Sequence, residues 1–373
     1  MLIKYVLMFL PVYFMSFECV PKTIIKQMNI LMAKFFWGKM GQGRYMAPVA
    51  WKYICRPIEE GGLGVRDLNL FGEALFLKLL WAIISDDKKL WVHICNAKYC
   101  PKVGFWNVKL NSPCSRIWRN MVQRKDFFKE NVKWSIGDGS RIKAVAQPWF
   151  RGWWEQTQIT QGSKGKMVAD LYDFSMMKWK VDELNQMFNQ NQLSEITAIQ
   201  PQPTRGGAQD RLIWVQSKRG KYSVKEGYKL LRSQANMPPN NEVAVLWQQI
   251  QNWKGVVPKV KNFLWRLISG ALMLSQNVHR RIHVVSAMCQ RCHTENEFET
   301  HCFFCHGSRL VWFGSTLGLR THDLPLNVVT SIDHCTIHMT EEQIKIFSYT
   351  LWEIWKARNE AVIQYKRFEP VEI

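Results

Sequence analysis

The feature that most constrains the fold is a cluster of cysteines and histidines between residues 289 and 306. It begins with the pair Cys289 and Cys292, continues after eight intervening residues with His301, and reaches Cys305 four residues later. A Cys-x2-Cys turn brings two thiolates within reach of one ion, and His301 and Cys305 would lie on one face of a helix. The spacing predicts a tetrahedral Cys3His set that holds one structural zinc ion and leaves no position for an activated water.

Two alternatives to this ligand set stay open. Cys302 or His306 could replace a member of the second pair, and His293 lies beside the first pair. The cysteines could also be small buried hydrophobic residues next to Phe303 and Phe304, as free cysteines often are. Four of the ten cysteines of a 373-residue chain fall in this segment, which is typical of metal binding rather than of a disulfide framework. We therefore expect a reducing, intracellular location, nuclear or cytoplasmic.

The charge balance indicates a polyanionic partner. Fifty Lys and Arg residues against thirty Asp and Glu residues give a net charge of +20. Such a balance favours RNA or DNA over a membrane surface. The apolar run over residues 1–20 imitates a secretory signal, but Pro11 divides it, Glu18 is charged, and it is short for a membrane span. We expect neither export nor a membrane partner.

Basic residues concentrate between Thr204 and Arg232, a segment with eight basic and only two acidic residues. This segment is a candidate phosphate-facing strip. The residues that we predict to contact nucleic acid, here called the basic strip, are Lys218, Arg219, Lys221 and Lys225.

Hydrophobic periodicity predicts a mostly helical chain. Apolar residues recur at three and four over residues 21–37, 69–85, 245–253, 258–270 and 341–367. Short apolar runs around turns predict β-hairpins at 134–142 and 212–224, and polar residues at 189–192 and 199–209 predict a linker. The expected class is α+β, predominantly helical, with a helical N-terminal region, small β-hairpins and a small zinc-stapled helical C-terminal domain.

Other chemistry-bearing groups have simpler interpretations. Asp86 and Asp87 follow a helical run and precede two lysines, which indicates a solvated helix end rather than a magnesium site. Cys95, Cys100 and Cys114 lack a partner that completes a compact set, so we expect buried thiols. The tryptophans of residues 149–154 and 247–265 are predicted to be core residues rather than base platforms.

Several motifs carry a family resemblance. GKYSVKEGYKLL, LWQQIQNWKGVVPKVKNFLWRLISGALMLSQNVHRR, CQRC, THCFFC and RLVW resemble the zinc-binding domain of plant non-LTR (LINE-type) retrotransposon reverse transcriptases over residues 221–312. By this resemblance Cys289, Cys292, His301 and Cys305 fall on the zinc-ligand positions. This chain has one residue fewer between the histidine and the last cysteine than members of that family usually have.

The resemblance extends along most of the chain. LPVYFMSFECVPKTI, FFWG, EEGGLGVRDLNLFGEALFLKLLW and WSIGDGSRI are similar to the stretch after the polymerase palm, and LWEIWKARNE is similar to the segment before the RNase H domain. It implies four segments. They are a helical region over 1–100, a mixed connecting region with a hairpin and a polar linker over 101–203, the zinc-binding domain over 204–320, and a C-terminal helix over 321–373 that precedes a missing RNase H domain.

The expected function also depends on catalytic motifs that the sequence lacks. The [FY]-x-D-D signature of the polymerase palm is absent from the sequence, as are endonuclease and RNase H carboxylate sets. Nucleotidyl transfer needs carboxylates that hold two cations. We therefore expect a non-catalytic, zinc-binding and nucleic-acid-binding C-terminal fragment of a reverse transcriptase polyprotein, with RNA or DNA as partner. The alternatives are a degenerate retroelement fragment without a selected function, and part of an RNA-directed DNA polymerase whose palm is on another chain, which would make the remainder of a reverse transcriptase a partner.

Overall fold

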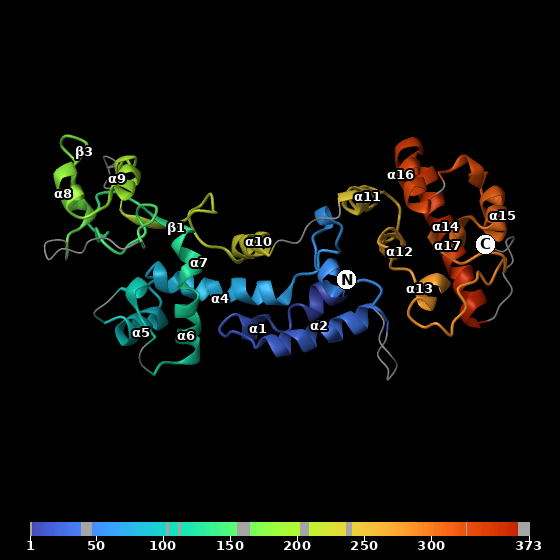
Figure 1. The fold of residues 1–373 in the computed structure, drawn as a ribbon, viewed down its shortest axis with the longest axis horizontal. Coiled ribbons are helices and arrows are strands. Elements are labelled where there is room, and N and C mark those ends of the chain that lie inside the picture. Colours follow the sequence, from blue (N-terminus) through green and yellow to red (C-terminus); the bar gives the residue numbers. More distant parts are fainter. Residues whose placement is uncertain are drawn as a thin grey trace. The chain divides into compact units, whose positions relative to one another are not determined.

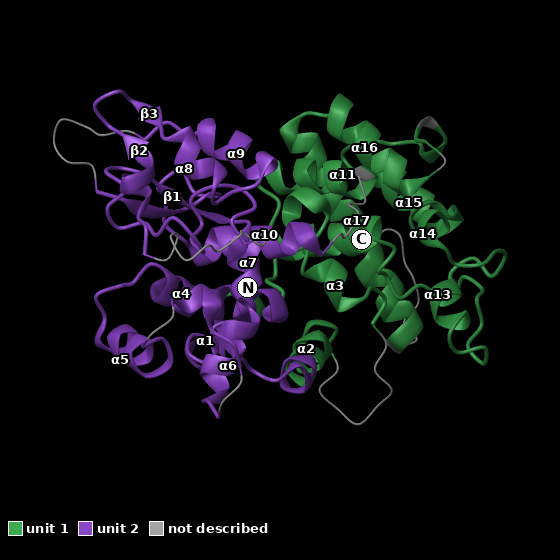
Figure 2. Cartoon of the chain, turned by 60° about the vertical axis from the view of Figure 1, so that its left-hand side comes forward, with its two compact units in different colours: residues 1–5, 27–67, 237–373 green, residues 6–26, 68–236 purple. Residues whose placement is uncertain are grey.

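The computed structural model describes residues 2–38, 47–101, 104–110, 113–154, 165–201, 209–235, 241–325 and 327–364. Helices predominate in these residues, and the strands form two small antiparallel pairs (Figure 1). This confirms the predicted class. The chain divides into two compact units (Figure 2), which we call unit 1 (residues 1–5, 27–67 and 237–373) and unit 2 (residues 6–26 and 68–236).

Unit 2 is built on helix α4 (Leu68–Ile84), which confirms the helix predicted at 69–85. Helix α10 (Val224–Gln234) packs along α4, and the buried hydroxyl of Tyr222, just before α10, donates to the carbonyl of Ala74 at 2.8 Å. The hydroxyl of Ser223 caps α10 by accepting from the Glu226 N–H. The other helices of this part are α1 (Val12–Met15), α5 (Leu90–Tyr99), η3 (Phe105–Asn107), α6 (Arg116–Gln123) and α7 (Lys125–Lys129).

The strands pair differently from the predicted hairpins. Strand β1 (Val132–Ser135) does not fold back on residues 136–142. It pairs antiparallel with β4 (Arg211–Trp214), so that Val132 lies opposite Trp214. The hairpin predicted at 212–224 is also wrong, because β4 is followed by a tight loop, residues 215–220, closed by a hydrogen bond from the Trp214 N–H to the Gly220 carbonyl. The short pair β2 (Tyr172–Asp173) and β3 (Lys178–Trp179) is a hairpin that the sequence analysis missed.

The β1–β4 ladder has one face buried in the core of unit 2. Val132, Leu212 and Trp214 are buried in the core of α4 and its neighbouring helices. Tryptophan and phenylalanine also fill a second core in residues 136–199, where Trp149 and Trp153 are buried. The prediction that the tryptophans of 149–154 belong to the core is confirmed for these two, whereas Trp154 is 39% exposed.

The predicted linker is partly structured. Asn189 caps helix α9 (Gln190–Thr197), which follows η5 (Val168–Leu171) and α8 (Val181–Asn185), so the polar stretch 189–192 starts a helix instead of a linker. Of the stretch 199–209, residues 202–208 lie outside the described residues. Asp210, at its end, is buried and accepts hydrogen bonds from the N–H groups of Gly137, Gly139 and Arg141. The segments before and after residue 203 therefore pack together in unit 2, and the two units cut across the four predicted segments.

Unit 1 contains most of the helices near the cysteine cluster. Helix α2 (Lys22–Phe36), which confirms the helix predicted at 21–37, passes from unit 2 into unit 1. The π-helix η1 (Ile3–Leu7) also spans the boundary between the two units. The remaining elements of unit 1 are α3 (Trp51–Ile54), η2 (Ile58–Glu60), α11 (Asn241–Asn252), α12 (Pro258–Ile268), α13 (Ser275–His279), α14 (Glu299–Phe304), α15 (His306–Gly314), η6 (Thr321–Asp323), α16 (Val328–His338) and α17 (Glu341–Gln364). Helices α11, α12 and α17 confirm the predictions at 245–253, 258–270 and 341–367.

A glycine turn joins the early and late parts of unit 1. The carbonyls of Gly61 and Gly62 accept hydrogen bonds from the indole N–H groups of Trp265 (2.9 Å) and Trp247 (2.8 Å). A Cβ at Gly62 would lie 2.1 Å from the carbonyl oxygen of Arg56, so the turn requires glycine there. Both tryptophans are buried, which confirms that residues 247–265 supply core tryptophans.

The long helix α17 closes this unit. Ile344, Phe347, Leu351 and Ile354 are buried along one side of α17, which packs against α12, α14 and α15. None of the helices in the described ranges is both long and apolar enough to cross a membrane.

Candidate metal centre

A narrow loop before α14 presents the first two cysteines. Met288 pairs with Asn296 in an isolated antiparallel bridge, and the Cys289 N–H donates to the Glu295 carbonyl at 2.8 Å. His293, with a φ of +54°, takes the left-handed conformation at the loop's tip. The loop therefore folds back on itself and holds Cys289 and Cys292 close together.

Three predicted ligands converge in space. Side-chain donor atoms of Cys289, Cys292 and His301 all lie within 4.8 Å of one another. The Cys292 Sγ and His301 Nε2 atoms are 3.1 Å apart. In a tetrahedral zinc site, bonds of about 2.3 Å to sulfur and 2.0–2.1 Å to nitrogen place such atoms roughly 3.6 Å apart. The donor set therefore fits a zinc ion after a small adjustment.

Cys305 reaches the same group from the C-terminal end of α14. It follows His301 by one helical turn, as predicted, since the Cys305 N–H donates to the His301 carbonyl at 2.9 Å, and the chain leaves the helix only after Cys305. The Cys305 side chain shares a hydrogen bond with Cys289. The N–H of Ser308, in the first turn of α15, also donates to the Cys305 sulfur. A helix N-terminus favours negative charge, so this position suits a thiolate.

Two of the predicted cysteine ligands, Cys292 and Cys305, are prepared to lose their protons. The hydrogen bond from Cys289 and the donors of Ser308 lower the pKa of Cys305 to about 4, although burial opposes this. Burial raises the pKa of Cys292, but hydrogen bonds from the Thr294 hydroxyl and from the Thr294 and Glu295 N–H groups overcome it and lower the pKa to about 6. The pKa of Cys289 is raised, because its proton is shared with Cys305 and because the thiol is buried. Zinc ligation requires thiolates, and an ion would displace this shared proton.

Two residues that the sequence did not single out, Glu295 and Thr294, hydrogen-bond to the predicted ligands and orient them. The Nδ1 atom of His301 lies 3.1 Å from the Glu295 carboxylate, which leaves Nε2 facing the cysteines. Such a carboxylate partner selects the tautomer of a metal-bound histidine. The Thr294 hydroxyl donates to the Cys292 sulfur at 3.1 Å. Thr294 and Glu295 lie in the spacer between the two pairs, where residue type alone carries no distinguishing signal.

Arg291 contributes positive charge to a site that would hold several thiolates. Burial opposes its protonation, but the Coulombic interaction with Cys302, Cys305 and Cys289 raises the pKa of the guanidinium above its usual value. It donates to the Ser308 hydroxyl at 2.7 Å and to the carbonyl of Cys302. Arg291 thus links the first cysteine pair to α14 and α15.

The alternative ligands occupy other positions. Cys302 is fully buried in the core, and this burial raises the pKa of its thiol to about 12. His293 and His306 are exposed. The structure brings together Cys289, Cys292 and His301 and places Cys305 against Cys289. Their assignment as ligands stays a prediction.

A buried ion pair ties the cysteine loop to the rest of unit 1. The Glu297 carboxylate, which is fully buried, accepts hydrogen bonds from the Ser275 N–H (2.8 Å), the Ser275 hydroxyl (2.7 Å) and the Arg358 Nε (2.8 Å). Burial raises the pKa of Glu297, but Arg358 and Ser275 outweigh it and lower the pKa. The cysteine loop is therefore held between α13 and α17.

The other candidates lie in unit 2. Asp86 is exposed just after α4, and Asp87 pairs with Lys89 at 2.7 Å, which confirms a solvated helix end. Cys95, Cys100 and Cys114 pack against the core of unit 2 but are only partly buried, so the expectation of buried thiols is confirmed in part.

The basic strip lies on the surface of unit 2. Lys218 and Arg219 are on the 215–220 loop, Lys221 follows it, and Lys225 is in the first turn of α10; all four are exposed. Their role in nucleic-acid binding stays a prediction.

The fold and the donor set define a predominantly helical protein with a Cys/His loop that could hold a metal ion. Residues 222–312 match the family model described as zinc-binding in reverse transcriptase. A putative ribonuclease H protein of Arabidopsis thaliana is 29% identical over 306 residues, which cover 78% of this chain and 47% of the relative. An uncharacterized mitochondrial protein of the same plant is 30% identical over 144 residues, which cover 38% of this chain and 94% of the relative.

The chain thus belongs to a family of retrotransposon-related proteins that carry the reverse transcriptase zinc-binding domain. It spans about half the length of the putative ribonuclease H protein.

Proposed function

We propose that this chain is a non-catalytic module of a reverse transcriptase polyprotein, in which one structural zinc ion stabilises a domain that binds RNA or DNA through the basic strip. The observation that carries the nucleic-acid part is the exposure of Lys218, Arg219, Lys221 and Lys225 on one loop and the adjoining helix turn. Lysine and arginine in such a position neutralise phosphates and release counterions.

The zinc would have a structural role. Cys289 and Cys305 are buried and His301 is 9% exposed, so an ion held by these residues and Cys292 would be largely surrounded by protein. A closed set of four ligands leaves no open position for a reacting water. The ten cysteines are all free thiols, which supports a reducing compartment, in the nucleus or the cytoplasm.

Salt-dependent binding tests the nucleic-acid function. Fluorescence anisotropy of labelled RNA and DNA oligonucleotides, measured from low to moderate salt, should show binding that weakens steeply as salt rises. Changing Lys218, Arg219 and Lys221 to Ala should reduce the magnitude of the slope of log K against log salt by about 2 to 3.

A matched control distinguishes an effect of the basic strip from an effect of total net charge. Changing Lys22, Lys26 and Lys34 of α2, which are also exposed, to Ala removes the same charge and should leave the slope near the wild-type value. Equal slopes for the two triple variants would show that binding does not depend specifically on the basic strip. No binding at low salt would contradict the proposed function.

Metal analysis tests the zinc centre. The purified full chain should contain one zinc ion, and Cys289→Ser or Cys292→Ser should abolish stoichiometric zinc. Cys335→Ser, which changes a buried cysteine of α16, is the control and should retain the metal. Zinc retained in His301→Ala would point to another fourth ligand. A wild-type protein that contains no zinc, and whose fold is unaffected by chelators, would contradict the structural role of zinc.

A further inference from the structure

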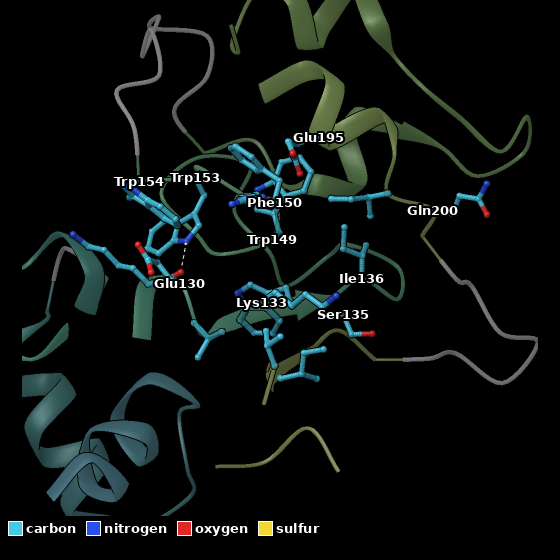
Figure 3. Close-up of a pocket in the computed structure, with 17 residues that line it drawn as sticks. Glu130, Lys133, Ser135, Ile136, Trp149, Phe150, Trp153, Trp154, Glu195 and Gln200 are labelled. Atoms are coloured by element: carbon cyan, nitrogen blue, oxygen red, sulfur yellow. Dashed lines mark hydrogen bonds between the residues drawn. The ribbon is translucent and has the colours of Figure 1, made fainter. Parts of the chain in front are cut away.

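A cleft of about 760 Å³ in unit 2 lies beside the β1–β4 ladder and is separate from the metal centre. Its volume falls within the usual range of small-ligand sites, about 300–1,000 Å³. Figure 3 shows that Trp153 and Trp154 lie on one side and that Lys133 and Ser135 project from β1 on another. The cleft therefore combines aromatic and basic groups in one hollow.

Trp154 is the aromatic group available to a ligand. It is 39% exposed, whereas its neighbour Trp153 is buried, and the two rings stand nearly perpendicular with centroids 6.0 Å apart. The indole N–H of Trp153 donates to the Lys129 carbonyl at 3.3 Å, which holds that ring in place. A fixed buried ring thus supports an exposed one at the edge of the cleft.

The charges around the cleft suit a polyanion at its entrance. Lys133 and Arg151 are exposed and, within the described part of the chain, form no ion pair. Glu130 and Glu195 also line the cleft. Carboxylates repel phosphates but accept hydrogen bonds from the amino groups of bases, as in the pairing of glutamate with cytosine.

The cleft adjoins the basic strip. The cleft is lined by Ile213 of β4 and by Val215, the first residue of the 215–220 loop. This loop folds back over β4, since a Cβ at Gly220 would lie 3.1 Å from the Ile213 side chain. A strand whose phosphates lie on Lys218 and Arg219 would pass directly beside the cleft.

We propose that this cleft accepts an unpaired base of single-stranded nucleic acid, stacked on Trp154, while Lys133, Arg151 and the basic strip hold the flanking phosphates. The inference rests on the proposed nucleic-acid function and adds its substrate class. Aromatic platforms beside basic residues bind single strands in a sequence-tolerant way, because every base has a stacking face. In a duplex these faces are covered by neighbouring bases, so single strands should be preferred.

Binding of a 12-nucleotide oligouridine, with a 12-base-pair RNA duplex for comparison, tests the proposal on the full chain. Trp154→Ala should weaken oligouridine binding by about 5- to 100-fold, the range expected for loss of one stacked base, and should change duplex binding little. Trp154→Phe should retain most of the affinity, because it keeps a stacking ring. Phe313→Ala, an exposed aromatic of α15 outside the cleft, is the matched control.

The outcomes separate this inference from the function on which it rests. If Trp154→Ala binds oligouridine like the wild type while the triple variant of Lys218, Arg219 and Lys221 binds weakly, the cleft proposal is wrong and the basic strip stands. Equal loss for single strand and duplex in Trp154→Ala would also overturn the cleft proposal. If the wild type binds neither RNA at low salt, both proposals fail.

Discussion

Replacing Arg358 by Met should destabilise the part of unit 1 that contains the cysteine loop. Arg358 is 4% exposed and its guanidinium contacts both carboxylate oxygens of the fully buried Glu297. Removal of one partner from a buried pair costs about 3–5 kcal/mol, because the remaining charge stays buried without a counter-ion. We therefore expect the free energy of unfolding of this unit to fall by about 3–5 kcal/mol.

Two further variants divide this cost into its causes. Glu297→Met combined with Arg358→Met removes both charges and leaves only the Ser275 donors without their acceptor, so its cost should be lower, about 1–3 kcal/mol. Lys356→Met is the control on the same helix. It breaks a partly solvent-exposed ion pair with Glu353, and should cost at most about 1 kcal/mol.

The pH dependence gives the sign of the electrostatic effect. Because the folded state lowers the pKa of Glu297, the ion pair stabilises the protein fully above the unfolded pKa of about 4.3, and this stabilisation is lost as pH falls through the folded pKa. In Arg358→Met, Glu297 loses its counter-ion and only the Ser275 hydrogen bonds oppose burial, so the pKa of Glu297 should be higher than in the wild type and the stabilisation from its ionised form should be smaller. The difference in free energy of unfolding between the wild type and Arg358→Met should therefore be large at pH 7 and smaller near pH 4.

Urea unfolding of the full chain, with hydrogen exchange of the amides around Ser275 and Glu297 as a local probe, measures these changes. Loss of exchange protection should concentrate in the cysteine loop, α13 and α17. A cost for Arg358→Met no larger than that of Lys356→Met, or equal costs at pH 4 and pH 7, would refute the reasoning.

Three other predictions concern unit 2 and catalysis. Asp210→Ala should cost about 3 kcal/mol in urea unfolding, because the buried N–H groups of Gly137 and Gly139 and the partly buried N–H of Arg141 lose their acceptor; an unchanged midpoint would contradict this. Gly227→Ala should destabilise unit 2 by about 1–3 kcal/mol, since the new Cβ would lie 1.9 Å from the Tyr222 hydroxyl, and a wild-type Tm would be inconsistent with the packing of α10 on α4. In primer extension on an RNA template with magnesium or manganese, the protein should incorporate no nucleotide above a heat-killed control, and activity abolished by changing Asp86 and Asp87 to Asn would reverse our interpretation of that pair.

The sequence alone determined the local elements whose signal is periodic. Helices α2, α4, α12 and α17 appear where apolar residues recur at three and four, because a helix that buries one side needs this spacing whatever it packs against. The close approach of Cys289 and Cys292 also follows from local spacing, because a two-residue gap closes a turn without help from the rest of the chain.

Only the tertiary structure decided the pairings between distant residues. The turn after β1 predicts a hairpin, yet β1 pairs with β4, about eighty positions later, and Asp210 supplies the acceptor for that turn. Cys289 and Cys305, sixteen positions apart, share a hydrogen bond, a contact that the spacing within either pair does not reveal. Such contacts depend on which surfaces remain to be buried once the helices have packed, and that information is spread over the whole chain rather than over any one segment.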